Sequence, residues 1–450
     1  MSISGFPELL PAQRFAELAV LDRLRTAFEL HGFAPIETPA VESLEQLLRK
    51  GEIDKEVYVL RRLQAGDETS DAGLGLHFDL TVPFARYVLE HAGHLEFPFR
   101  RYQIQKVWRG ERPQTGRYRE FTQADIDVVA RDVLPFHHDV EVARVMAEAL
   151  AALDFLPPLR LQVNNRRLIE GFYRGLGATD VPAVMRVIDK LDKMPAGAVA
   201  QQLVDEAGLI ETQAAQCLAL ADIRSTDTSF VDRVRALGVT HELLDVGLAE
   251  LAAVIEGCAA ISGAQVSVEA DLRIARGLDY YTGTVFETRM AGYDSLGSIC
   301  SGGRYDALAS DGKVTYPGVG ISLGVTRLLV PLFADGVVGA SRSVPSAVLV
   351  ALPADHDRAA CDAIAQDLRA RGIPVEVAAT PQKFGKQIRY AERRGIPFVW
   401  FPGSDGSAHQ VKDIRSGDQL DADPASWTPP ADDLRPQVVR RSTPNTPQGS

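Results

Sequence analysis

The chain has 450 residues, which exceeds the size of one compact domain and predicts two or three. Its composition, 46% hydrophobic and 24% charged, is typical of a soluble globular protein. The formal net charge of -12 argues against diffuse attraction to nucleic acid, but it leaves a local basic surface open.

Sequence signals for export, membrane insertion and cross-linking are not found. The first residues, MSISGFPELLPAQRF, hold no basic segment followed by an apolar run, so we expect no signal peptide. No apolar stretch reaches the roughly 18 residues of a membrane span, so no membrane partner is expected. The cysteines form no C-x-x-C pair, which argues against a structural zinc site or a disulfide framework. We therefore expect the protein to be located in a reducing cytoplasm.

The first elements follow from apolar spacing and from proline. Residues 11–31 have the spacing of a helix, and the proline-containing segment 33–43 is expected to be extended. Strands are predicted at 56–62 and 76–82, with a short helix after Pro83.

From residue 99 to residue 129, the pattern predicts two strands joined by the basic loop RPQTGRYRE. Phe121, Gln123 and Asp127 would share one strand face by period-two spacing. Seven basic residues between positions 100 and 119 suit a phosphate ligand, because guanidinium groups bind phosphate oxygens in a two-pronged geometry. A solvated basic hairpin is the alternative. The basic residues are Arg100, Arg101, Lys106, Arg109, Arg112, Arg117 and Arg119.

The rest of the chain changes character twice. After a helix at 139–153 and a strand, residues 165–262 have helical spacing throughout and predict a helical insertion. Strands return at 265–300. Residues 344–428 then alternate between strand and helix patterns and predict a βαβαβ unit, and the proline-rich tail 429–450 is expected to be disordered.

The stretch RGLDYYTGTVFE, residues 276–287, carries more hydrogen-bonding groups than a structural strand needs. Arg276, Tyr281 and Glu287 cannot all be solvated if this strand is central. Ordinary strand packing, with tyrosine hydroxyls reaching solvent, is the alternative. The paired glycines of SICSGGRYDAL allow close approach of a ligand to the backbone, or mark a bulge.

Two more segments complete the candidate site. The glycine-rich YPGVGISLGVTRLL leads into a helix with Arg327; it lacks the P-loop pattern, and glycine-mediated strand–helix packing is its alternative. In HFDLTVPFARY, Asp79 and Thr81 are expected to alternate on one strand face. Arg109, Arg276 and Arg327 would converge favourably only around an anion, and a triphosphate fits.

These motifs resemble the histidyl-tRNA synthetase family over nearly the whole chain. GERPQTGRYREFTQADID is similar to motif 2 of class II aminoacyl-tRNA synthetases, GVGISLGVTRL to motif 3, and the segment through Pro39 to motif 1. RGLDYYTGTVFE and SGGRYD resemble the two histidine-specific motifs. The 344–428 unit, with KFGKQIRYAERRGIPFVWFPG, is similar to the family's anticodon-binding domain.

The resemblance implies an α+β fold: a class II antiparallel sheet of six or seven strands flanked by helices, a helical insertion and a C-terminal α/β anticodon-binding domain. It implies a cytoplasmic homodimer that joins L-histidine to tRNA(His) through histidyl-adenylate, with ATP and Mg²⁺ as the substrate complex and no tightly bound protein metal. The implied domains are 1–164 and 263–336 (catalytic core), 165–262 (insertion), 344–428 (anticodon-binding domain) and 429–450 (tail).

The resemblance also implies roles for single residues. Arg109 and Arg276 would hold the α-phosphate from opposite sides, and Gln123 would complete the catalytic set. Those implied for ATP are Arg109, Glu111, Phe121, Arg276 and Arg327. Those implied for histidine are Asp79, Thr81, Gln123, Asp127, Tyr280, Tyr281 and Tyr305. Those implied for tRNA are Arg117, Lys383, Lys386 and Arg389.

The chain departs from the family pattern at two positions. Thr326 stands where class II enzymes usually carry an acid, and Ser301 stands where the second histidine motif often has glycine. A regulatory subunit of ATP phosphoribosyltransferase and a non-catalytic tRNA-binding sensor are the alternatives. The arginines of the motifs and the intact 344–428 unit argue against both.

Overall fold

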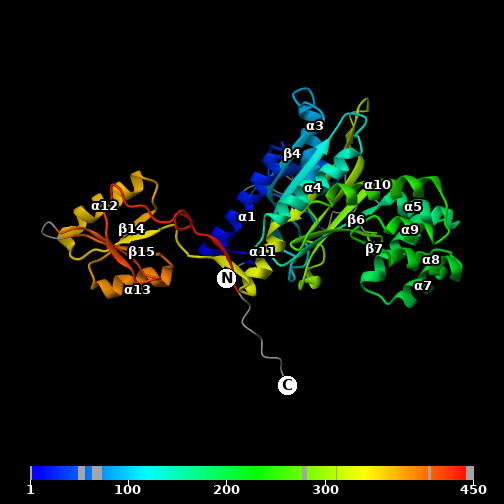
Figure 1. The fold of residues 1–450 in the computed structure, drawn as a ribbon. Helices are drawn as coiled ribbons and strands as arrows, with labels where there is room; N and C mark the ends of the chain where they lie inside the picture. Colours follow the sequence, from blue (N-terminus) through cyan, green and yellow to red (C-terminus); the bar gives the residue numbers. More distant parts are fainter. Residues whose placement is uncertain are drawn as a thin grey trace, which may run out of the picture. The chain divides into compact units, whose positions relative to one another are not determined.

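In the computed structural model, the described residues are 3–48, 56–62, 73–275, 281–310, 312–403 and 407–441. They form two compact units, one within Met1–Pro7 and Leu21–Pro331 and the other within Glu8–Val20 and Leu332–Ser450. Figure 1 labels their main elements. Across these ranges, no helix has the length and apolar character needed to cross a membrane.

A mixed sheet is the framework of the first unit. In sheet order, its strands are β1 (Ala34–Pro35), β4 (Phe99–Trp108), β5 (Glu120–Val129), β11 (Thr315–Gly324), β10 (Cys300–Ser310), β9 (Thr284–Met290), β6 (Leu159–Asn165), β8 (Val266–Asp271) and β7 (Arg224–Ser225). All neighbours are antiparallel except β1 with β4 and β6 with β8. Among the described residues, this sheet thus has nine strands rather than the six or seven implied by the resemblance. The difference arises because β1 and β7 add a two-residue strand at each edge.

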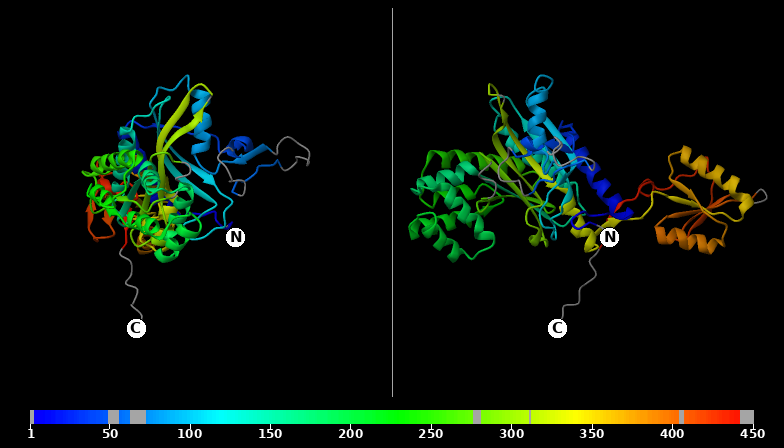
Figure 2. Two further views of the ribbon diagram at one scale, coloured as in Figure 1. Left: turned by 90° about the vertical axis from the view of Figure 1, so that its right-hand side faces the viewer. Right: turned by 180° about the vertical axis from the view of Figure 1, so that it is seen from behind.

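Helices flank this sheet and fill the segment between β6 and β8. Those outside that segment are α1 (Pro11–Leu30), α2 (Leu44–Leu47), α3 (Thr81–His91), α4 (His137–Ala151) and α11 (Val325–Ala334). Those inside it are α5 (Arg166–Gly175), α6 (Val181–Ile188), α7 (Ala196–Asp205), α8 (Glu211–Ala221), α9 (Phe230–Arg235) and α10 (Glu242–Cys258). The predicted helical character of this segment is confirmed, and both figures show these helices gathered in one group (green in Figures 1 and 2).

Close packing anchors that group through two glycines. A Cβ atom at Gly171 on α5 would lie 2.2 Å from the backbone nitrogen of Leu244, and one at Gly247 on α10 would lie 2.1 Å from that of Leu168. Only glycine therefore lets α5 and α10 approach this closely. Asn165, the last residue of β6, caps α5 by accepting from two backbone amides.

The strands predicted at 56–62 and 76–82 are wrong. Val59 makes only an isolated bridge to Gly75. The short strand β3 (Leu74–Leu76), paired with β2 (Val41–Ser43), ends at the first residue of the second stretch. The β-branched residues of these stretches favour a strand locally, but tertiary context overrides that preference.

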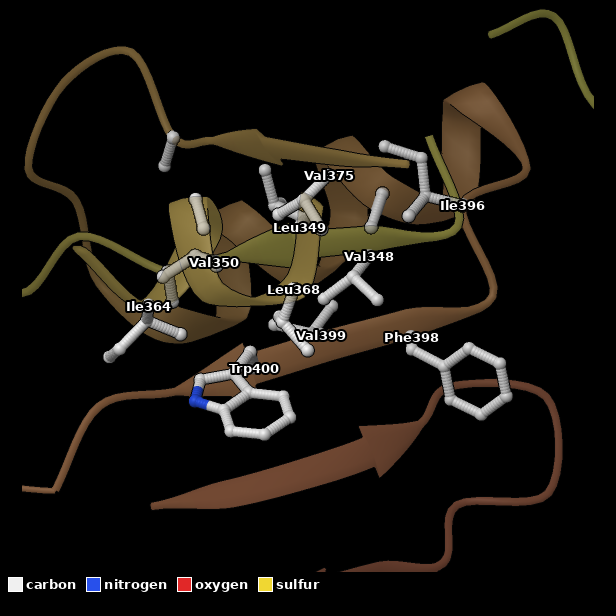
Figure 3. Close-up of a cluster of buried hydrophobic side chains, with 14 of the residues drawn as sticks. Val348, Leu349, Val350, Ile364, Leu368, Val375, Ile396, Phe398, Val399 and Trp400 are labelled. Atoms are coloured by element: carbon white, nitrogen blue, oxygen red, sulfur yellow. The ribbon is translucent and has the colours of Figure 1, made fainter. Parts of the chain in front are cut away.

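The second unit has its own sheet of five strands among the residues described. They are, in sheet order, β14 (Val375–Val377), β13 (Val348–Val350), β15 (Phe398–Phe401), β16 (Gln410–Asp413) and β17 (Gln419–Asp421). The first three are parallel and are connected through α12 (Arg358–Ala370) and α13 (Phe384–Arg394), which confirms the predicted βαβαβ order. Figure 3 shows its core, in which Leu349, Leu368 and Trp400 are buried.

The disordered tail predicted from residue 429 is wrong as far as residue 441. There β18 (Val438–Arg440) pairs antiparallel with β12 (Val338–Ala340). Asp433 also accepts from both terminal nitrogens of Arg415, at 2.7 and 2.8 Å. Backbone pairing and a two-pronged ion pair therefore order a segment whose composition suggested none. Residues 442–450 lie outside the described residues.

Candidate active site

A cavity of about 350 Å³ lies over β5, β10 and β11 in the first unit. Its lining joins segments of the chain that are more than 200 residues apart and carries both signs of charge. The charged lining residues are Asp79, Glu111, Asp125, Arg109, Arg117 and Arg327. The lining residues that the sequence predicted for histidine or ATP are Asp79, Thr81, Arg109, Glu111, Phe121, Gln123, Tyr281 and Arg327. A site of this kind can hold a ligand with both cationic and anionic groups.

The β4–β5 hairpin supplies one wall of the cavity. The two strands are paired antiparallel from Phe99 opposite Val129 to Trp108 opposite Glu120, so the predicted hairpin is confirmed. Just beyond β4, Arg109 donates through Nε to the carbonyl of Phe78 at 2.9 Å, and its guanidinium carbon lies 5.2 Å from the ring centre of Phe121. This contact fixes an arginine beside an aromatic face at the edge of the cavity.

Most of the predicted basic cluster does not reach the cavity. Successive residues of a strand point to opposite faces, so the cluster is divided between different surroundings. Four members are ion-paired: Arg100 with Glu141, Arg101 with Asp127, Lys106 with Glu120, and Arg117 with Glu111. Of the seven basic residues, only Arg109 and Arg117 line the cavity. The interpretation of the whole cluster as a phosphate site is therefore wrong.

Asp127 and Tyr305, both predicted to bind histidine, are hydrogen-bonded to each other and are not in the cavity lining. The Tyr305 hydroxyl donates to Asp127 Oδ1 at 2.8 Å, while Nη2 of the fully buried Arg101 lies 2.6 Å from Asp127 Oδ2. A buried carboxylate needs such partners to stay charged. Asp127 is thus held as an oriented anion.

Two glycines of β11 make room for this pair. A Cβ atom at Gly320 would lie 2.0 Å from Asp127 Oδ1, and one at Gly318 would lie 2.4 Å from the ring of Tyr305. From the sequence, these glycines could serve either a ligand site or strand–helix packing. In the structure they are required because the side chains of Asp127 and Tyr305 occupy the space that a Cβ atom would need.

Asp125 and Ser322 are site residues that sequence reasoning missed. Asp125 lines the cavity and is 2% exposed, and the Ser322 hydroxyl donates to its Oδ1 at 2.5 Å. Burial raises the pKa of Asp125 to about 7, against the opposing effects of Arg101 and the Ser322 hydrogen bond. The missed signal was period-two spacing, which places Asp125 on the same strand face as Phe121 and Gln123.

Asp79 and Thr81 lie at the start of α3 rather than on a strand, which corrects the predicted alternation. The Asp79 carboxylate accepts from the backbone amide of Val82 at 3.0 Å, and α3 begins at Thr81. Pro83 is tolerated in the first helical turn, because no partner within the helix awaits an N–H there. Both Asp79 and Thr81 still line the cavity.

The departure at Thr326 has a structural role. Its hydroxyl accepts from the backbone amide of Thr122 on β5 at 2.8 Å, and the residue is 6% exposed. Thr326 therefore ties the start of α11 to β5 at the position where an acid was expected. The next residue, Arg327, lines the cavity and donates to the carbonyl of Leu296.

The histidine-like motif is described only from Tyr281 onward. Arg276 and Tyr280 lie outside the described residues. Tyr281 lines the cavity, and Gly303 leaves room for its ring, since a Cβ atom there would lie 2.7 Å from it. The departure Ser301 is exposed on β10 and also lines the cavity.

The residues predicted for tRNA fall in both units. Arg117 lines the main cavity and lies 3.5 Å from Glu111. Lys383, Lys386 and Arg389 are exposed, the first at the N-cap of α13 and the others on that helix. Lys386 also lines a cavity of about 190 Å³ in the second unit.

Comparisons with known proteins bear on both units. A family model described as histidyl-tRNA synthetase matches residues 5–328, and one described as anticodon binding domain matches residues 347–423. Histidine–tRNA ligase of Micrococcus luteus is 62% identical over 98% of each chain. That of Cutibacterium acnes is 59% identical over 97% of this chain and 98% of its own. The crystal structure of histidyl-tRNA synthetase from Nostoc sp. PCC 7120 superposes with a TM-score of 0.84 at 34% identity, over 94% of this chain and 96% of that one.

Proposed function

The chain belongs to the histidyl-tRNA synthetase family and attaches L-histidine to tRNA through histidyl-adenylate, and we propose that the cavity over β5, β10 and β11 is where this adenylate forms. The observation that carries the proposal is the mixed lining. Acidic and amide side chains suited to an ammonium group share one cavity with arginines suited to phosphate.

For histidine, we assign the α-ammonium group to Asp79, Thr81 and Gln123. An ammonium is a donor only, so it needs the acceptor oxygens that these side chains offer. The neutral imidazole needs one acceptor and one donor, for which we propose Asp127 and the hydroxyl of Tyr281. The support for Asp127 is its orientation as an anion, and the support for Tyr281 is its place in the lining. Tyr280 and Tyr305 would complete this pocket.

For ATP, we assign the α-phosphate to Arg109 and Arg276, and the adenine to Glu111 and Phe121, with Arg327 on the other face of the base and near the γ-phosphate. The contact between Arg109 and the Phe121 ring supports a nucleotide at this end of the cavity. Mg²⁺ would arrive bound to the phosphates, since it usually keeps several waters and is held largely through phosphate oxygens.

The chemical step follows from these positions. A carboxylate oxygen of histidine attacks the α-phosphorus, the new O–P bond forms, and the bond to the pyrophosphate leaving group breaks. Negative charge grows on the α-phosphate oxygens, and the arginines assigned to them would lower the barrier by stabilising that charge. Holding both reactants in line lowers the barrier further, because the bound reactants no longer need to meet by chance in the reactive orientation.

The remaining assignments concern the partners. We propose that Lys383, Lys386 and Arg389 contact tRNA(His) from the second unit and that Arg117 contacts it at the main cavity. The match of residues 347–423 to an anticodon-binding model supports the former. We further propose a homodimer acting in the cytoplasm, as expected for the family.

The test is ATP–pyrophosphate exchange by the purified protein with and without histidine. We expect exchange that depends on histidine and that glutamine or asparagine cannot support, because buried hydrogen-bonding groups reject ligands that leave them unpaired. Absence of exchange while histidine still binds would instead favour the regulatory or sensor alternative.

A further inference from the structure

Three polar side chains at the cavity are hydrogen-bonded in series. Gln123 and Asp125 lie on β5, and Ser322 lies on the neighbouring β11, directly opposite Asp125. Gln123 donates through Nε2 to the Ser322 hydroxyl oxygen at 2.7 Å, and that hydroxyl donates to Asp125 Oδ1 at 2.5 Å. All three residues line the cavity.

The direction of this series is fixed by the number of protons. A serine hydroxyl has one proton to donate, and at pH 8, above the raised pKa of Asp125, that carboxylate is ionised and can only accept, so the proton of Ser322 points to Asp125. The hydroxyl oxygen can then only accept from Gln123. The amide of Gln123 must therefore turn its nitrogen toward Ser322 and its oxygen away from it.

The amide oxygen that results is an acceptor in need of a donor. Gln123 is 7% exposed, and its Oε1 has no hydrogen-bond partner among the described residues. A buried carbonyl left without a donor is unfavourable, so this oxygen favours a ligand that brings an N–H group. The reversed amide would present its own N–H groups and repel such a ligand.

We propose that Ser322 and Asp125 are positioning residues, which orient the Gln123 amide so that its oxygen receives the α-ammonium group of histidine. The proposal rests on the assignment of Gln123 to that group. Because a hydrogen bond to a charged group is involved, losing the orientation weakens histidine binding about tenfold to a hundredfold.

The experiment measures the affinity of the full-length protein for two ligands by calorimetry at pH 8. One ligand is histidine, and the other is imidazole-4-propionate, which lacks the ammonium group. Ser322→Ala is expected to weaken histidine about tenfold or more and to leave imidazole-4-propionate within about twofold. Equal weakening of both ligands, or of neither, overturns the proposal.

Two further variants separate orientation from folding. Ser322→Thr keeps a hydroxyl and is expected to restore most of the histidine affinity. In a Gln123→Glu background both side-chain oxygens are equivalent, so Ser322→Ala is expected to cost histidine affinity at least threefold less than in the parent. An equal cost in both backgrounds contradicts an orienting role.

Gln123→Ala distinguishes failure of this inference from failure of the underlying assignment. If this variant binds histidine as the parent does, Gln123 does not meet the ammonium group, and both ideas fall. If it binds weakly while Ser322→Ala binds normally, the assignment stands and only the orienting role of Ser322 and Asp125 is wrong.

Discussion

The hydroxyl of Tyr305 donates to Oδ1 of Asp127 at 2.8 Å, across two strands that are not neighbours in the sheet. With Arg101 2.6 Å from the other carboxylate oxygen, both oxygens of Asp127 have a partner inside the protein. The proposed imidazole acceptor is thus aligned before any substrate arrives, and contacts behind the cavity lining control its direction.

Tyr305→Phe tests that control. Losing one hydrogen bond to the carboxylate is expected to raise KM for histidine about three- to tenfold while KM for ATP stays unchanged, measured by pyrophosphate exchange. The matched control is Tyr316→Phe, which removes the hydroxyl of another buried tyrosine, on β11 and outside the cavity lining. If KM for histidine is the same in both variants, Tyr305 does not act through Asp127.

Arg101→Leu tests the buried ion pair as a source of stability. The change leaves Asp127 and the nearby Asp125 without their buried cation, so we expect a loss of about 3–5 kcal/mol in the free energy of unfolding by urea. Arg100→Leu is the control, because Arg100 is partly exposed and pairs with Glu141. It should lose less than about 1 kcal/mol. Similar losses in the two variants would deny Arg101 a special role.

Arg276→His tests the assignment of the second α-phosphate arginine. We expect the fold to stay intact and the rate of adenylate formation to fall about 100-fold or more, since a preorganised charge at the reacting phosphate is lost. Single-turnover formation of histidyl-adenylate is the measurement, and Arg112→His, at an exposed position, is the control. An unchanged rate would sink the role given to Arg276.

Lys386→Ala and Arg389→Ala test the division of labour between the units. Each removes one exposed positive charge from α13, so KM for tRNA in aminoacylation should rise several-fold at low salt and should increase less steeply with added salt than in the parent. Pyrophosphate exchange, which needs no tRNA, should not change. A defect in exchange would contradict the assignment of these residues to tRNA.

Asp125 predicts a pH dependence of stability. Burial raises the pKa of Asp125 to about 7 in the folded protein, from an ordinary value near 3.8. At a pH between these two pKa values, the folded state therefore keeps a proton that the unfolded state has lost. The contribution of this proton to the free energy of unfolding is therefore complete below about pH 3.8 and is lost as pH rises to about 7. The loss is at most about 1.4 kcal/mol per pH unit. The titratable groups facing Asp125 are Arg101, Asp127, Asp79 and Cys300.

The check is urea unfolding of Asp125→Asn and the parent between pH 4 and pH 8. The variant cannot titrate at this position, so its stability should fall less than that of the parent as pH rises to about 7 and should change like the parent above it. Parallel curves over the whole range would show that Asp125 does not carry this proton.

Elements with a strong local pattern could be predicted from the sequence. The β4–β5 hairpin and the βαβαβ order of the second unit follow from short-range periodicity and turn residues, which act within a few positions. The start of α3 was missed, because the residues around Asp79 fit a strand as well as a helix start and only contacts in the folded chain decide between them.

The contacts within the site depend on strand register, which a single sequence does not reveal. Ser322 meets Asp125 because β5 and β11 pair with these residues opposite each other, at positions 197 residues apart. Arg101 illustrates the same limit, since it resembled the other basic residues of its strand and lies fully buried. Composition can suggest such groups, but only the pairing of distant strands brings them together.

Gly320 on β11 leaves the space that the side chain of Asp127, on the neighbouring strand β5, occupies. A Cβ atom there would overlap the Asp127 carboxylate, so the acceptor exists only because the facing strand leaves it space. An engineer who replaced Asp127 by alanine to admit a different amino acid would open a void, and a side chain introduced at position 320 would enter it. The depth and the chemistry of the proposed histidine pocket can therefore be redesigned from two different strands.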